Sequence, residues 1–136
     1  MNGYKKQIEF LDWEYGMFFH FGIRSFYPGH VDWDNKDMPP ERSNPTELDC
    51  EQWIRVAKEA GATYAILTTK HHEGFCLFDS KYTDYKITNT AFGRDLVKEY
   101  VEAFRAEGIK VGFYYSLIDW HHPEFTIDHL HPLKVR

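Results

Sequence analysis

The sequence contains little cysteine, no long apolar run and no cluster of positive charge. Its two cysteines, Cys50 and Cys76, are far apart in the chain, so no disulfide framework is indicated and a reducing compartment is the default. No apolar segment approaches the length that spans a membrane, and the N-terminal segment lacks the apolar core of a signal peptide. We therefore predict a cytoplasmic protein that does not bind a membrane.

Charge and glycine patterns exclude further classes of ligand. The net charge is -5, and lysine and arginine are scattered along the chain. Nucleic acids and anionic surfaces are bound by clustered positive charge, so we predict no nucleic-acid partner, and a neutral ligand fits better than a phosphorylated one. The GxGxxG and P-loop patterns of nucleotide sites are absent. Aromatic residues reach 18%, which fits either an aromatic core or rings that stack on sugars or bases.

The chain alternates apolar runs that predict strands with amphipathic segments that predict helices. We predict strands at 16–21, 63–69 and 110–117 and helices at about 50–60 and 96–107. Asp49 is expected to cap the first helix, whose apolar face is read as Trp53, Val56, Ala57 and Ala60. The corresponding face of the second helix is read as Val97, Tyr100, Val101 and Phe104. Because the strands are apolar on both faces, the order β-α-β-α-β predicts an α/β fold with a parallel sheet covered by helices.

Chemically similar residues follow each predicted strand. The first strand leads to His20, the second to Lys70, His71 and His72, and the third contains Tyr114. Further along lie Ser116 and the run from Asp119 to His121. The carboxyl ends of neighbouring parallel strands meet at one edge of a sheet, where (β/α) barrels carry their chemistry. Because an imidazole can donate from one nitrogen and accept at the other, this edge would suit a polyhydroxylated ligand.

Other interpretations of these residues remain open. Any one histidine can be a hydrogen-bonded core residue, Cys76 can be read as a thiol nucleophile, and Lys70 as a Schiff-base lysine. A zinc site is a further alternative, but neighbouring residues of a strand point to opposite sides. We therefore expect the side chains of His71 and His72 to diverge rather than to share an ion. We predict neither a metal nor a cofactor.

Several strings of the sequence resemble one enzyme family. They are GMFFHFG at 16–22, DCEQW at 49–53, LTTKHHEGF at 67–75, RDLV at 94–97 and GFYYS at 112–116. The string at 67–75 is the most specific of them. Together they resemble the α-L-fucosidases of glycoside hydrolase family 29, and the resemblance runs from about Trp13 to Pro123.

The resemblance implies a (β/α)8 TIM barrel and a retaining hydrolase that removes terminal α-L-fucose from glycoconjugates. Of that barrel, only the first three strands and two helices would be present, so residues 1–136 are expected to form one incomplete domain. The residues expected to bind the fucose are His20, Asp32, Trp33, His71, His72 and Tyr114. In the family the residue at position 32 is more commonly Glu, so the shorter Asp32 alters the reach of that carboxylate.

The resemblance also implies that the catalytic carboxyl groups are not in this segment. The family's Asp nucleophile and Glu acid/base are expected beyond Arg136, so we predict that the 136 residues alone are inactive. Three parallel strands would leave two open edges. A fucose-binding or self-associating half-barrel, or assembly with a complementary C-terminal segment, is therefore the alternative expectation.

Overall fold

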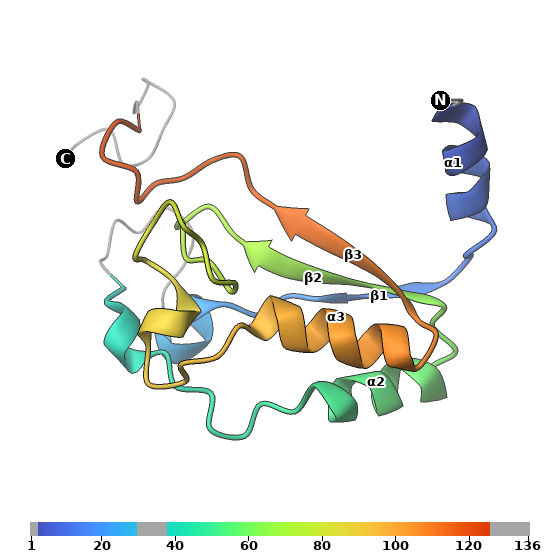
Figure 1. Cartoon of the computed structure of the whole chain (residues 1–136), viewed down its shortest axis with the longest axis horizontal. Coiled ribbons are helices and arrows are strands. Elements are labelled where there is room, and N and C mark those ends of the chain that lie inside the picture. The colour runs from blue at the N-terminus through green and yellow to red at the C-terminus, as the bar shows by residue number, and fades with distance from the viewer. Residues whose placement is uncertain (1–2, 30–37, 126–136) are drawn as a thin grey trace.

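The computed structural model describes residues 3–29 and 38–125 as a three-stranded parallel sheet with helices (Figure 1). The elements are α1 (Gly3–Leu11), β1 (Gly16–Phe19), α2 (Cys50–Glu59), β2 (Tyr64–Lys70), α3 (Leu96–Ala106) and β3 (Lys110–Tyr115). The strands lie in the order β1-β2-β3, with both neighbouring pairs parallel. The predicted α/β class and strand order are confirmed. The first and third strands each end two residues earlier than predicted.

Helices α2 and α3 begin where side-chain caps satisfy their first amide groups. The Asp49 carboxylate accepts a hydrogen bond from the backbone N–H of Glu51 at 2.9 Å, and Asp95 does the same for Lys98 at 2.9 Å. The expected cap at Asp49 is confirmed. The expected apolar face of α2 is wrong in part, because Val56 is 42% exposed while Ile54 is buried. The helix meets the sheet along the row of Cys50, Ile54 and Ala57.

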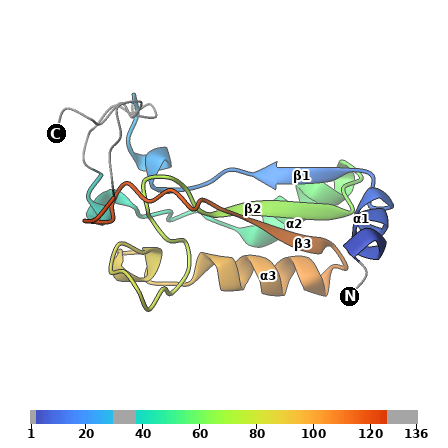
Figure 2. The same cartoon turned by 90° about the horizontal axis from the view of Figure 1, so that it is seen from above.

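Both of these helices cover the same face of the sheet, and the core lies between the two layers (Figures 1 and 2). Ala65 and Leu67 of β2 are fully buried there, together with Tyr100 and Phe104 of α3. The ring of Phe19 packs edge-on against that of Phe104, with 5.5 Å between the ring centroids. This layer fixes the positions at which the three strands end.

In the part of the chain that the structure describes, the face of the sheet opposite α2 and α3 is left open, as expected for three strands of an incomplete barrel. Phe18 on β1 is 52% exposed. Within the described ranges, α2 and α3 both lie on the other face of the sheet (Figure 1). Phe113 and Tyr115 on the edge strand β3 are 51% and 53% exposed. Apolar strand residues therefore face solvent in this chain, both on the open face and along the β3 edge.

Helix α1 was not predicted from the sequence. It lies beyond the amino-terminal ends of the strands (Figure 2). The centroid of the Phe10 ring lies 5.4 Å from that of Tyr64, and the centroid of the Trp13 ring lies 5.8 Å from that of Tyr64. No residue of α1 is buried, and these aromatic contacts lie at and just after its C-terminal end.

No helix within residues 3–29 and 38–125 is both long enough and apolar enough to cross a membrane.

Candidate active site

Three imidazole rings and one phenol ring gather where the strands end. His20 follows β1, His71 and His72 follow β2, and Tyr114 lies near the end of β3. The centroid of the His71 ring is 5.1 Å from that of His20, 4.2 Å from that of His72 and 6.0 Å from that of Tyr114. The parallel register explains the clustering, since Phe19 pairs with Leu67 and Thr68 with Tyr114.

The expectation that His71 and His72 diverge is wrong. Their rings lie 4.2 Å apart at an interplanar angle of 35°. The alternation of side chains applies inside a strand, but β2 ends at Lys70 and the register with β3 shifts between Thr68 and Lys70. Both histidines therefore lie in the turn after the strand, where the backbone can aim successive side chains the same way.

Each imidazole meets a protein partner at Nδ1. His20 lies 3.4 Å from Thr68 Oγ1, His71 lies 3.1 Å from Glu73 Oε2, and His72 lies 2.5 Å from Ser116 Oγ. A partner at one ring nitrogen fixes the orientation of the ring and directs Nε2 away from that partner.

The partner of His71 belongs to a buried ion-pair network. Glu73 is only 7% exposed, and its Oε2 lies 3.6 Å from Arg24 Nε as well as near His71. Arg24 comes from the short 3₁₀ turn Ile23–Phe26 that follows β1. The carboxylate thus joins the segments after β1 and β2 beneath the imidazoles.

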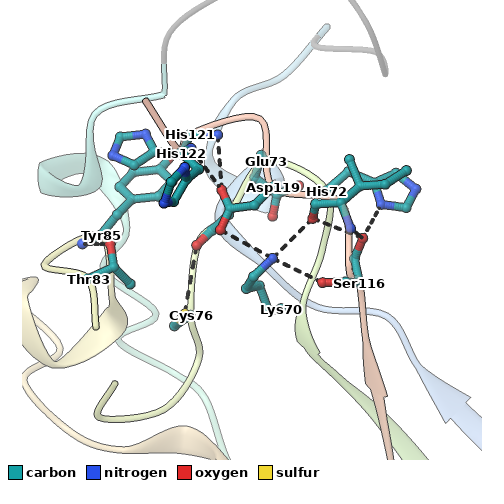
Figure 3. Close-up of polar contacts among 12 residues, drawn as sticks. Lys70, His72, Glu73, Cys76, Thr83, Tyr85, Ser116, Asp119, His121 and His122 are labelled. Atoms are coloured by element: carbon teal, nitrogen blue, oxygen red, sulfur yellow. Dashed lines mark hydrogen bonds and ion pairs between the residues drawn. The ribbon is translucent and has the colours of Figure 1, made fainter. Parts of the chain in front are cut away.

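Lys70 holds the segment after β3 against the end of β2. Its ammonium is buried and donates to the carbonyl oxygens of Ser116 and Ile118, both at 3.0 Å, and lies 3.4 Å from Asp119 Oδ2 (Figure 3). The same ammonium lies 4.9 Å from the centroid of the Tyr115 ring. A Schiff-base lysine needs a neutral amine open to a carbonyl substrate, whereas this amine is used structurally. The structure does not favour that alternative.

The segment held by Lys70 supplies three contacts to His72. Ser116 Oγ meets Nδ1 of the ring, and the Trp120 ring lies 5.4 Å from the imidazole centroid. The backbone N–H of Trp120 also donates to the carbonyl oxygen of His72 at 2.8 Å. The sequence placed Ser116 and Trp120 at the same edge of the sheet as the histidines, but it did not predict their contacts with His72.

Gly74 permits the close approach of this segment. It has φ +88°, and a Cβ at this position would lie 2.4 Å from Asp119 Oδ1 and 2.8 Å from the Cβ of His121. Asp119 Oδ1 in turn accepts from the backbone N–H groups of His121 and His122, at 3.0 Å and 3.1 Å (Figure 3). Only glycine combines this φ value with the space that Asp119 occupies.

The remaining candidates lie apart from the imidazole cluster. The His121 ring stacks on Tyr85 at 4.0 Å, and both His121 and His122 line a separate hollow of about 690 Å³ next to Lys70 and Asp119. Cys76 is 2% exposed, and burial raises the pKa of its thiol, so the reactive thiolate is disfavoured. The thiol-nucleophile alternative therefore has no support.

Two expected site residues, Asp32 and Trp33, lie outside the described residues. Within residues 3–29 and 38–125, no three His, Cys, Asp or Glu side chains come together as possible ligands of one metal ion.

Comparison with known proteins identifies one family throughout. The family described as alpha-L-fucosidase matches residues 2–135. Alpha-L-fucosidase 1 of Arabidopsis thaliana is 39% identical over 117 residues, which cover 82% of this chain and 23% of that enzyme. Among solved structures, alpha-L-fucosidase isoenzyme 1 from Paenibacillus thiaminolyticus superposes with a TM-score of 0.84 at 46% identity, covering 96% of this chain and 34% of the other.

A further solved structure bears on the chemistry. It is a trapped covalent intermediate of an α-L-fucosidase from Bacteroides thetaiotaomicron with 2-fluoro-fucosyl fluoride, at a TM-score of 0.77 and 36% identity. The match covers 87% of this chain and 31% of that chain. The present chain thus spans about a quarter to a third of the length of these relatives.

Proposed function

The chain belongs to the α-L-fucosidase family, and we propose that residues 1–136 form the part of a fucosidase active site that binds the hydroxyl groups of terminal α-L-fucose. The observation that carries the proposal is the cluster of His20, His71, His72 and Tyr114 at the carboxyl ends of three parallel strands. Each imidazole offers a donor or an acceptor without carrying a fixed charge, and the phenol offers both. These are the groups that neutral sugar hydroxyls require.

The resemblance adds two residues to this proposed site. Asp32 would contribute a carboxylate that accepts from sugar hydroxyls, and Trp33 a flat ring that packs on the C–H face of the sugar. With the cluster they would form one aromatic-walled site without a fixed positive charge, which fits the acidic rather than basic character of the chain.

For the whole protein we propose hydrolysis of α-L-fucosides with retention of configuration. A carboxylate attacks the anomeric carbon while a second carboxyl group protonates the leaving oxygen, and water then releases fucose from the enzyme. The trapped covalent intermediate of the Bacteroides relative supports this course. The two carboxyl groups of a retaining glycosidase lie roughly 5 Å apart across the sugar.

The described residues offer no free carboxylate pair for these two roles. Glu73 is the carboxylate that meets the cluster, and it is buried against Arg24 and His71. We therefore propose that the nucleophile and the acid/base come from outside the described residues and, as the family resemblance implies, from beyond Arg136. The sheet would then be three strands of a (β/α)8 barrel, which agrees with the uncovered Phe18 and with Phe113 on the β3 edge.

The decisive test is turnover of an aryl α-L-fucoside by the full-length protein. Aryl α-D- and β-D-galactosides are assayed separately as alternative substrates. We expect release of the phenol from the fucoside alone, and loss of that activity in His71→Ala. Turnover of another glycoside without turnover of the fucoside would overturn the substrate assignment.

A second candidate is a fucose-binding or self-associating module without hydrolase activity. The observation that favours it is the exposure of Phe18, Phe113 and Tyr115 on the open face and edge of the sheet, surfaces that a second copy or a complementary segment could bury. Assays of the purified 136-residue chain distinguish the two candidate functions. Fucoside hydrolysis by this chain that His71→Ala abolishes would contradict the module, and a monodisperse monomer by light scattering would contradict self-association.

A further inference from the structure

The two adjacent histidines have chemically different partners at the same ring nitrogen. Nδ1 of His71 meets a carboxylate oxygen of Glu73 at 3.1 Å, whereas Nδ1 of His72 meets the hydroxyl of Ser116 at 2.5 Å. A carboxylate only accepts hydrogen bonds, while a hydroxyl can donate or accept. The two rings therefore need not carry their hydrogens on the same nitrogen.

For His71 the partner fixes the position of the hydrogen. Glu73 is buried and its Oε2 also lies 3.6 Å from Arg24 Nε, and as a carboxylate oxygen it can only accept from the ring. Nδ1 of His71 must therefore carry the hydrogen, and in the neutral ring the lone pair is on Nε2. This ring accepts a hydrogen bond at Nε2.

For His72 the direction depends on where the Ser116 hydroxyl donates. Its oxygen already accepts from the backbone N–H of Ile118 at 3.1 Å. Its hydrogen has two acceptors in reach, Nδ1 of His72 at 2.5 Å and the carbonyl oxygen of Ile118 at 3.1 Å. The carbonyl oxygen already accepts from the Lys70 ammonium at 3.0 Å, so one of its two lone pairs is used. We infer from the shorter contact that the hydroxyl donates to His72, in which case Nδ1 of this ring holds the lone pair and Nε2 holds the hydrogen.

We propose that Glu73 and Ser116 hold His71 and His72 in opposite tautomers, so that the first ring accepts and the second ring donates at Nε2. Glu73 and Ser116 are then positioning residues, and Lys70 supports Ser116 by using one lone pair of the competing carbonyl oxygen of Ile118. The inference rests on the proposed function only in naming the ligand as a sugar. With ring centroids 4.2 Å apart, the pair would receive one hydroxyl as donor and the same or a neighbouring hydroxyl as acceptor, which selects a fixed orientation of the sugar.

The test is a long-range 1H–15N spectrum of the histidine rings of the protein, recorded near neutral pH without ligand. The two rings are assigned with His71→Gln and His72→Gln. We expect His71 as the Nδ1–H tautomer, the minor form of free histidine, and His72 as the Nε2–H tautomer. The same tautomer in both rings, averaging in both, or a doubly protonated His72 would overturn the inference.

Reciprocal variants test the cause. Glu73→Ala should return His71 towards the Nε2–H form and leave His72 unchanged. Ser116→Ala should shift the Nδ1 signal of His72 and leave His71 unchanged, while Ser116→Thr, which keeps the hydroxyl, should restore the signal of His72. Variants that move neither ring, or both rings equally, would contradict the assignment of roles, and the unsubstituted protein decides the tautomers even if a variant does not fold.

These results are separable from the proposed function. The spectrum contains no sugar, so identical tautomers would leave the fucoside assay as the test of function. Absence of fucoside turnover would equally leave the measured tautomers standing.

Discussion

Lys70 at the end of β2 and Asp119 in the segment after β3 form an ion pair with 3.4 Å between Nζ and Oδ2. The pair lies 49 residues apart in sequence and joins two strand ends side by side. The ammonium is almost fully buried, with a side-chain exposure of 4%, while Asp119 is 30% exposed. The ion pair therefore fixes the segment that carries Ser116 and Trp120 against His72.

We expect Lys70→Met to destabilise the fold by about 2–4 kcal/mol, because two carbonyl oxygens and Asp119 lose a buried charged donor together. Chemical denaturation measures the loss. Lys58→Met is the matched control, since Lys58 pairs with Glu107 at 2.6 Å but both side chains are about half exposed. That change should cost less than about 1 kcal/mol. Equal losses in the two variants would contradict the structural role of Lys70.

Gly74→Ala should be more harmful than an alanine at another glycine of similar backbone conformation. At Gly74 the Cβ would lie 2.4 Å from Asp119 Oδ1, whereas Gly108, at φ +76°, has nothing within 4 Å. The left-handed conformation costs about 1–2 kcal/mol at either position. The clash at Gly74 should add about 1–3 kcal/mol. Denaturation midpoints that agree for Gly74→Ala and Gly108→Ala would rule out the close approach of Asp119.

The fold was largely predictable because its signals are local. Asp49 and Asp95 cap helices where the sequence places an acidic residue before an amphipathic run, and the strand order follows from the alternation of elements. Helix α1 was not predicted, because it has no buried residue and therefore no buried face that an apolar pattern in the sequence would mark. The exposure of Val56 shows the limit of reading a helix face from apolar spacing without the neighbouring layer.

The clustering of the four described candidate residues was predictable, but the contacts that hold them were not. Parallel strand ends must meet at one edge, which is why His20, His71 and Tyr114 could be grouped in advance. The closeness of His71 to His72 was not foreseen, because it depends on where β2 ends and on the register shift after Thr68. The contact of Ser116 with His72 joins residues 44 positions apart, and no local pattern in the sequence reports it.

Tyr100→Phe should destabilise the protein by about 1 kcal/mol, the value of one buried hydrogen bond. The Tyr100 hydroxyl is fully buried and donates to the carbonyl oxygen of Ala65 at 2.7 Å, which ties α3 to β2. Tyr115→Phe is the comparison, because that side chain is 53% exposed and its ring face towards Lys70 is unchanged by the substitution. It should be close to neutral in the same unfolding assay. A neutral Tyr100→Phe would show that the hydroxyl contributes nothing to this contact.

Both described cysteines should react slowly with iodoacetamide in the folded protein at pH 8 and quickly after unfolding. Burial raises the pKa of Cys50 from 9.0 to about 11 and also raises the pKa of Cys76. Because the fold favours the neutral thiol of Cys50, this contribution to stability is complete below pH 9 and is lost as the pH rises towards about 11. Mass spectrometry of the protein at successive times measures the rate at which each cysteine is alkylated. Rapid labelling of either thiol under native conditions would contradict its burial.

The most direct measurement of the central claim is a titration of the histidine ring signals with L-fucose, followed by NMR and repeated with the mirror-image sugar D-fucose. If the imidazole cluster binds the hydroxyls of α-L-fucose, the signals of His20, His71 and His72 will shift and saturate with L-fucose alone, while His121 and His122 stay unchanged. Unmoved cluster signals, equal shifts with D-fucose, or shifts confined to His121 and His122 would contradict the account.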